Sequence, residues 1–324
     1  MPTVSIVTPC YNASRYIGET IRSVQRQTFP DWELVVVDDG SCDASAGIVQ
    51  EFAVQDARVR LVRQSNQGQA SARNTGFAAC SPDSQFLVFL DADDCLEGEM
   101  LARLTSYLIA HHDVDMVYCG FHIIDSEGNP AADTSLVKAQ RYTARSFGLT
   151  KVPIDVPETT FVSLYLHWCG ALPSGTLIRR TAYEATTGWD PAFRRGAEDT
   201  DLFLQIALRS PVHFLPDVLL RYRRYQTQHS RNLTEASQGQ EQLCRKWENM
   251  TGLTLQEQHA VRRAILARKA WYLPCLWWEW GTDHVRNGET LEGIKCYARA
   301  VKRFIGYRLA MLAPDQLLKL LVDR

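Results

Sequence analysis

The run Phe86–Leu90 constrains the fold most, because it is apolar throughout and ends abruptly in acidic residues. It is too short for a helix and lacks the alternation of a half-exposed strand, so it predicts a strand buried on both faces of a parallel sheet. Asp91, Asp93 and Asp94 follow it directly. Open α/β sheets bind ligands at the carboxyl edge of their strands, so these acids mark a candidate site.

Two interpretations of these three acids are open from this stretch alone. Carboxylates close together raise one another's pKa unless a cation is present, and such oxygen ligands suit Mg²⁺ or Mn²⁺. The alternative is a solvated turn in which Asp94 caps a helix that begins near Leu96. The surrounding sequence has to decide between them.

Composition describes an ordinary globular chain of 324 residues with a formal net charge of -2. This length allows one large α/β domain, or an ordinary domain with an appended one, and the charge balance favours no nucleic-acid partner.

The 9 cysteines form no CxxC pair and are odd in number, which favours reduced thiols over disulfides or a zinc site. The N-terminus lacks the features of a signal peptide, and no apolar run approaches the ~18 residues of a spanning helix, so we expect a cytoplasmic protein.

Strands and helices alternate over the first half of the chain. Strands are predicted at 4–8, 32–37 and 59–62, each followed by a helix, the first of which Asn12 or Ser14 is expected to cap. Short connections between alternating elements predict a mostly parallel sheet with helices on both faces, which is an α/β fold. Further strands are predicted at 114–124 and, as an edge strand, from residue 218.

The loop after the first strand excludes two common nucleotide-binding classes. Residues 8–14 contain no glycine, so the G-x-G-x-x-G of a dehydrogenase is missing, and no P-loop motif occurs in the chain. Pro9 and Tyr11 could instead form a wall for a base whose ring N–H donates to Asp39. The alternative is a packed tyrosine and a solvated Asp-Gly turn.

A second acidic cluster begins a predicted amphipathic helix at Glu198, Asp199 and Asp201. A helix dipole stabilises acids at this position by ~0.3–1 kcal/mol, which accounts for one or two of them but does not require all three. His229, after the last predicted strand, is either a surface histidine or a ligand.

From about residue 236 the chain becomes helical in pattern and rich in tryptophan, so we place a boundary near 235. Residues 291–312 combine an apolar stripe with basic side chains around the helix. One interpretation is a helical cap packed on the preceding domain, and the other is peripheral docking on a membrane surface.

With these segments in hand, the chain resembles a family-2 glycosyltransferase with a GT-A fold over roughly residues 3–232. Six separated pieces carry the resemblance in the expected order: Val4–Asn12, Ser23–Thr28, Glu33–Ser41, Ala72–Gly76, Leu90–Asp94 and Glu198-Asp199. The resemblance implies a GT-A domain over 1–235, with a nucleotide-sugar half (about 1–125) and an acceptor half (about 126–235). It assigns no role to the helical region 236–324.

The resemblance also implies a role for particular residues. The nucleotide is expected at Pro9, Tyr11 and Asp39, with Arg73 also on the donor side. Asp91 and Asp93 form the D-x-D motif, with Asp93 as direct ligand of Mg²⁺ or Mn²⁺. Asp199, next to Glu198, is expected to be the general base. Weaker candidates in the segment that closes over the diphosphate are Arg223, His229 as a further metal ligand, and Ser230.

These expectations describe a metal-dependent, inverting transfer of a hexosyl or N-acetylhexosaminyl group. The donor would be a nucleotide sugar, expected to be UDP-linked, and the acceptor a hydroxyl of a glycan or lipid-linked molecule in surface polysaccharide or glycoconjugate biosynthesis. A carboxylate base and a metal at the leaving diphosphate suit that chemistry. The alternative is a non-catalytic protein that uses the same fold to bind a nucleotide sugar or to act as a scaffold.

Overall fold

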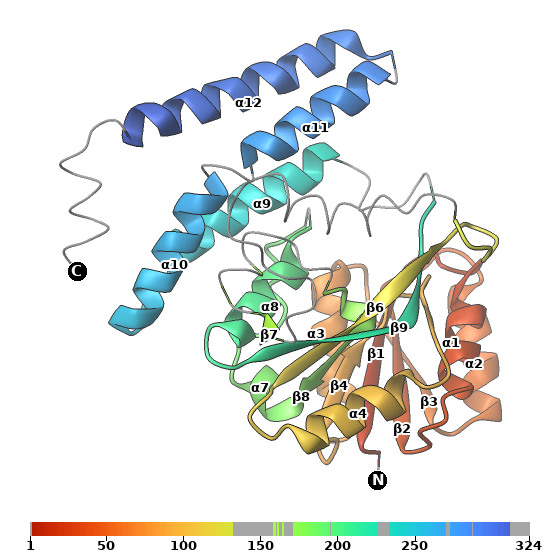
Figure 1. The fold of residues 1–324 in the computed structure, drawn as a ribbon. Helices are drawn as coiled ribbons and strands as arrows, with labels where there is room; N and C mark the ends of the chain where they lie inside the picture. Colours follow the sequence, from red (N-terminus) through yellow and green to blue (C-terminus); the bar gives the residue numbers. More distant parts are fainter. Residues whose placement is uncertain are drawn as a thin grey trace. The chain divides into compact units, whose positions relative to one another are not determined.

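The computed structural model describes residues 2–131, 158–159, 161, 164, 171–194, 196–225, 233–269, 273–286 and 288–311. In these residues a 9-stranded sheet is flanked by helices, and a helical C-terminal region follows (Figure 1). The predicted α/β architecture is therefore confirmed. The chain divides into two compact units between Leu243 and Cys244, inside helix α9 (Leu233–Glu248), and each unit is described here by itself.

The sheet of the first unit is parallel on one side and mixed on the other. Its strands are β1 (Val4–Cys10), β2 (Trp32–Asp38), β3 (Val59–Arg63), β4 (Phe86–Phe89), β5 (Cys95–Leu96), β6 (Met116–Ile124), β7 (Glu158–Thr159), β8 (Thr176–Arg179) and β9 (Val212–Arg223). The order is β3-β2-β1-β4-β8-β6-β9-β5, and β7 pairs with β9. Strands β3, β2, β1 and β4 run parallel, whereas β8 is antiparallel to both of its neighbours.

The central strands are buried on both faces, which explains their continuous apolar runs. Alternate side chains supply the two faces. Ile6, Leu34 and Val36 belong to the core that also contains Ile21 of α1 (Ile17–Gln25) and Leu104 of α4 (Met100–Ala110). The intervening positions face the helix α3 (Gln69–Ala79) on the opposite side.

Gly76 allows α3 to approach this opposite face closely. A Cβ at Gly76 would lie 2.3 Å from Val7 Cγ1 and 3.0 Å from Val37 Cγ2, so no larger residue fits without displacement. The close approach fixes α3, and with it the Ala-Arg-Asn segment one turn earlier, against the sheet. Among the described residues of this unit, further helices are α2 (Ser45–Gln55), α7 (Arg180–Glu184) and α8 (Glu198–Ala207).

Three local predictions are wrong. Helix α1 begins at Ile17 after Tyr16, with no side-chain cap bond, so neither Asn12 nor Ser14 caps it. Asp94 caps no helix, because Cys95–Leu96 is a strand and α4 begins only at Met100. The predicted edge strand near residue 218 is instead part of β9, which begins at Val212 and lies inside the sheet between β6 and β5.

The described part of the second unit is helical and contains, beyond α9, the helices α10 (Leu255–Ala267), α11 (Leu273–Arg286) and α12 (Thr290–Met311). Helix α10 begins with a capping box formed by Thr254 and Glu257. Helices α11 and α12 run side by side (Figure 1), and Thr282 and Tyr297 are joined by a hydrogen bond of 3.1 Å between their hydroxyl groups. Among the described helices, none combines the length and the apolar character needed to span a bilayer.

Candidate functional site

The candidate site lies at the carboxyl edge of β1, β2 and β4. These strands are adjacent and parallel, so the loops that follow them meet at the same edge. The loops contain Tyr11, Asp39 and Asp91, respectively. Tyr11 is 53% exposed, whereas Pro9 is buried inside β1, where it pairs with Val37.

Asp39 is buried and holds the loop that leads into α3. Its carboxylate accepts hydrogen bonds from the backbone N–H groups of Gln67 (2.9 Å) and Gly68 (2.8 Å), and from the side-chain amide of Gln64 (2.7 Å). Gly40, next in the chain, has φ +76°, and a Cβ there would lie 3.0 Å from Asn66 N. The predicted Asp-Gly turn is therefore present, but its carboxylate is buried and ordered by the protein.

Asp91 is fixed by two side chains of α3. Its Oδ1 accepts hydrogen bonds from Gln69 Nε2 (2.9 Å) and Arg73 Nη2 (2.7 Å). Arg73 is 1% exposed, and its Nη1 also lies 3.3 Å from Glu198 Oε1. The two acidic clusters, which are more than a hundred residues apart in sequence, thus share one buried guanidinium group.

Trp189 supports this guanidinium group from one side. The Arg73 Cζ atom lies 4.1 Å from the centroid of the Trp189 ring, which is a cation–π geometry. Asn74 holds Trp189 in turn: its amide donates to the Trp189 carbonyl (2.7 Å) and accepts from the Trp189 N–H (3.1 Å). Each polar residue of the Ala-Arg-Asn segment therefore has a defined partner at the site.

Glu198 and Asp199 begin α8, after Ala197 in a left-handed conformation (φ 77°). Burial, and then the charge of Asp199, raise the pKa of Glu198 to about 7. Burial also raises the pKa of Asp199, although Thr200 N donates to its Oδ1 at 2.6 Å. Asp201, the third acid, is fully buried and accepts from Gln205 Nε2, so it belongs to the core of the helix.

Asp94 is buried beneath the site. Its Oδ2 accepts from Ser174 Oγ (2.6 Å) and its Oδ1 from the backbone N–H of Arg223 (3.0 Å). Ser174 Oγ also accepts from the Asp91 backbone N–H (3.1 Å). The third carboxylate of the acidic stretch therefore orders the loop that carries the other two.

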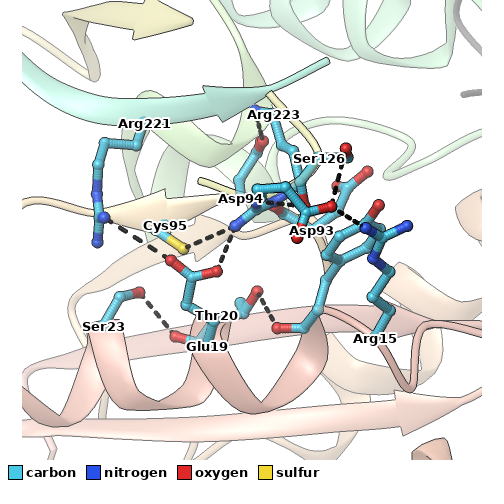
Figure 2. A network of polar contacts seen from close by, with 12 residues as sticks. Arg15, Glu19, Thr20, Ser23, Asp93, Asp94, Cys95, Ser126, Arg221 and Arg223 are labelled. Carbon is cyan, nitrogen blue, oxygen red and sulfur yellow. Dashed lines mark hydrogen bonds and ion pairs between the residues drawn. The ribbon is translucent and has the colours of Figure 1, made fainter. Parts of the chain in front are cut away.

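Arg223 lies under the same loop and contacts helix α1 (Figure 2). Its guanidinium donates to the Asp93 carbonyl (2.8 Å) and the Asp125 carbonyl (3.1 Å), and it forms an ion pair with Glu19. Two residues later, Tyr225 OH donates to Asp93 Oδ2 (3.0 Å). The end of β9 thus holds both the backbone and the carboxylate of Asp93.

The donor set at this edge fits a divalent cation bound together with a diphosphate. Burial, followed by the charge of Asp91, raises the pKa of Asp93 to about 6, and a cation bound beside the two carboxylates would offset both effects. Within the described part of the chain, no group of three or more His, Cys, Asp or Glu side chains is arranged to hold a metal. Two carboxylates still suit Mg²⁺ or Mn²⁺, because such ions commonly keep phosphate oxygens and water as further ligands.

The structure brings together most of the predicted site residues but does not describe all of them. His229 and Ser230 lie outside the described residues. Sequence reasoning did not assign roles to Asn74, Ser174 and Trp189, which order the acidic residues. The sequence offers little that would identify them. Asn74 is part of the segment Ala72–Gly76 that carries the family resemblance, and Ser174 and Trp189 lie beside glycines in turns.

Comparison with known proteins matches residues 5–186 to the family described as glycosyl transferase family 2. The chain is 41% identical to the uncharacterized glycosyltransferase EpsJ of Bacillus subtilis, over 38% of this chain and 35% of that protein. It is 32% identical to the putative teichuronic acid biosynthesis glycosyltransferase TuaG of the same organism, over 49% of this chain and 64% of TuaG. The chain thus spans less than two thirds of the length of either relative.

Two solved structures share the fold at low sequence identity. Staphylococcus aureus TarS 1-349, in complex with UDP-GlcNAc, has a TM-score of 0.60 and 17% identity, over 95% of this chain and 81% of that one. The mannosyltransferase PcManGT of Pyrobaculum calidifontis, in complex with GDP-Man and Mn²⁺, has a TM-score of 0.61 and 18% identity, over 98% and 81%. At this identity the likeness establishes the GT-A-like fold alone.

Proposed function

This chain belongs to glycosyl transferase family 2, and from that membership we propose that it transfers a sugar from a nucleotide-sugar donor to a hydroxyl group with inversion. The observation that carries the proposal is the bridge from Asp91 through Arg73 to Glu198, which joins the two acidic clusters. Inverting transfer needs a site for the leaving diphosphate and a base for the incoming hydroxyl. The cluster at Asp91 and Asp93 would serve the diphosphate, and the cluster at Glu198 and Asp199 would supply the base.

On the donor side, Tyr11 and Asp39 would border the nucleotide, and the buried Pro9 would shape the loop beneath it. Asp91 and Asp93 would hold Mg²⁺ or Mn²⁺, which stabilises the charge of the leaving diphosphate when it is bound. Arg73 would hold Asp91 in place through the hydrogen bond from its Nη2 to Asp91 Oδ1. Arg223 donates to the Asp93 carbonyl, so we assign it a positioning role for Asp93.

On the acceptor side, Asp199 would take the proton of the attacking hydroxyl. Burial raises its pKa, which makes its carboxylate a better proton acceptor than an ordinary aspartate. Glu198, held by Arg73, would keep the first turn of α8 in place. The resulting oxygen nucleophile would attack the anomeric carbon from the face opposite the diphosphate.

The donor class and the biological setting belong to the same proposal. UDP is our proposed nucleotide, and a hexosyl or N-acetylhexosaminyl group our proposed sugar. Of the two solved structures of similar fold, TarS contains UDP-GlcNAc and PcManGT contains GDP-Man. The name of TuaG, a putative teichuronic acid biosynthesis glycosyltransferase, supports a role in surface polysaccharide biosynthesis, and within that role the proposed acceptor is a glycan or a lipid-linked molecule. We place the activity in the cytoplasm, in line with the free thiols of Cys10, Cys42 and Cys80.

The test compares Asp199→Asn with the unchanged chain and with Glu184→Gln, a half-exposed acid on α7. Asp199→Asn is expected to bind UDP in the presence of Mn²⁺ normally and to lose transfer by about 10²–10⁴-fold, the usual contribution of a general base. Binding is measured by calorimetry, and turnover by UDP release with a panel of donors and acceptors. Glu184→Gln should behave as the unchanged chain.

Two results would contradict the proposal in different ways. Undiminished turnover in Asp199→Asn would reject Asp199 as the base. An unchanged chain that binds UDP-sugars but neither hydrolyses nor transfers them would favour the non-catalytic alternative.

A further inference from the structure

Helix α12 has one face packed tightly against α11. A Cβ at Gly293 would lie 2.5 Å from Val285 Cγ2 and 2.8 Å from the Gly281 carbonyl, and one at Gly281 would lie 2.7 Å from the Tyr297 ring. Ala300, two turns beyond Gly293, is also buried. Only glycine at both crossing positions permits this approach, so the rotation of α12 about its axis is fixed.

The other face of α12 carries an exposed apolar stripe. Leu291 is 68% exposed, Ile294 56%, Val301 45% and Ile305 51%, and Ala298 between them is also exposed. The spacing of three and four residues places all five on one side of the helix. Scattered exposed apolar residues are common, but a continuous line of them along one helix indicates an interaction surface.

Charge identifies the kind of partner. Within Thr290–Met311 the sequence has five basic residues (Lys295, Arg299, Lys302, Arg303 and Arg308) and one acid, Glu292. Lys295 and Lys302 follow Ile294 and Val301 directly, so both border the stripe on the same side. Both lysines are exposed. An apolar stripe bordered by lysines matches a surface that is apolar inside and anionic at its boundary.

A second copy of this chain is a poorer match for the same face. Two stripes packed against each other would bring Lys295 and Lys302 of both copies together, and α12 offers a single acid, Glu292, whose carboxylate is already paired with Lys295. Like charges at an interface oppose association. An anionic lipid surface offers negative charge to Lys302 and, besides Glu292, to Lys295, and it accepts the apolar stripe at the same time.

We propose that the exposed face of α12 lies on an anionic membrane surface, with Leu291, Ile294, Val301 and Ile305 inserted among the lipid chains and Lys295 and Lys302 at the headgroups. The proposed function gives this contact a purpose, since it would hold the enzyme where lipid-linked acceptors are found. Binding to the membrane does not depend on catalysis, so the two proposals fail separately.

The test is co-sedimentation of the full chain with vesicles of phosphatidylcholine alone or with about a third phosphatidylglycerol. One variant combines Ile294→Ser, Val301→Ser and Ile305→Ser, and a second combines Lys295→Gln and Lys302→Gln. Val54→Ser is the control, because Val54 is 78% exposed on α2, in the first unit. Light scattering gives the mass of each variant, circular dichroism its fold, and UDP release without vesicles its activity.

The unchanged chain and Val54→Ser should bind the anionic vesicles preferentially. The serine variant should bind more than tenfold more weakly, from lost apolar burial. The glutamine variant should lose about fivefold for each charge removed. Failure of the unchanged chain to bind anionic vesicles, or a fall in mass from dimer to monomer in the serine variant, would overturn the proposal. UDP release without vesicles should stay unchanged in both variants, and its absence in the unchanged chain would count against the proposed function alone.

Discussion

Arg73 is a buried cation that serves two groups of acids. Its guanidinium contacts Asp91 and Glu198 and lies over the Trp189 ring, so its charge is compensated on two sides and shielded on a third. A buried charge with one partner removed is costly, by about 3–5 kcal/mol. Substitution of Arg73 should therefore disturb both acidic clusters, so that UDP binding measured by calorimetry and turnover measured by UDP release fall together.

The acidic pair at the start of α8 predicts the pH dependence of turnover. Burial raises the pKa of both residues, that of Glu198 to about 7, so the charged forms are reached only as the pH rises. A base acts in its deprotonated form; kcat/KM for the acceptor should therefore rise with pH well above the ordinary aspartate range of about 4. The measurement uses saturating donor and metal from pH 5 to 8. A flat profile over this range would contradict the assignment of a buried base.

Sequence reasoning recognised these acids but not what holds them. Asp91, Asp93, Glu198 and Asp199 belong to short motifs that follow a strand or begin a helix, and both settings are visible in the sequence. The interpretation of Asp94 as a helix cap rests on the segment that follows it directly in sequence, near Leu96. Its actual partners, Ser174 and Arg223, are 80 and 129 residues away in sequence.

At the level of elements, α3 determines where the site forms. Gly76 allows it to lie directly on Val7 and Val37, and Arg73 and Asn74 project from the preceding turn. Helix α3 therefore connects the sheet to the acidic residues. It can lie this close to the sheet because Gly76 has no side chain.

Gly76→Ala tests this arrangement against a matched glycine. The added Cβ collides with Val7, which should cost about 1–3 kcal/mol and outweigh the gain of up to about 1 kcal/mol in helix propensity. Gly47→Ala, in α2, has no atom within 4 Å of the added Cβ and should gain stability by about 0.5–1 kcal/mol. Urea unfolding measures both. Equal shifts for the two variants would show that α3 tolerates displacement.

Those strands and helices were predictable whose pattern of apolar and polar residues is set within their own short segment of sequence. Strands β1, β2 and β4 were predicted because both of their faces are buried, and the helices between them were recognised from their spacing. Strand β9 was predicted six residues too short and at the wrong place in the sheet. Its first half includes His213, Pro216 and Asp217, which interrupt an apolar pattern. Its place in the sheet depends on its own pairings with β5, β6 and β7, which no local pattern specifies.

At the scale of the whole molecule, ligand binding should stabilise the unit that contains the site. UDP at about 100 times its Kd, with Mn²⁺, adds ~2.7 kcal/mol, which is about 5–10 °C in Tm for a unit of this size. EDTA or Asp93→Ala should remove most of this shift, whereas Glu51→Ala, on the exposed side of α2, should retain it. Thermal unfolding followed by fluorescence gives the values. A UDP-dependent shift that survives EDTA would reject the metal assignment.

The bonds of Asp94 also impose an order on biosynthesis. The loop that carries Asp91 and Asp93 emerges early from the ribosome, but the backbone N–H that Asp94 needs belongs to Arg223, 129 residues later. At about 5–20 residues per second, translation takes several seconds or more to supply it. A nascent chain that has formed the first parallel strands therefore contains Asp91 and Asp93 but lacks the bond from Arg223 that orders their loop, and the proposed donor site is complete only after the end of β9 has been synthesised.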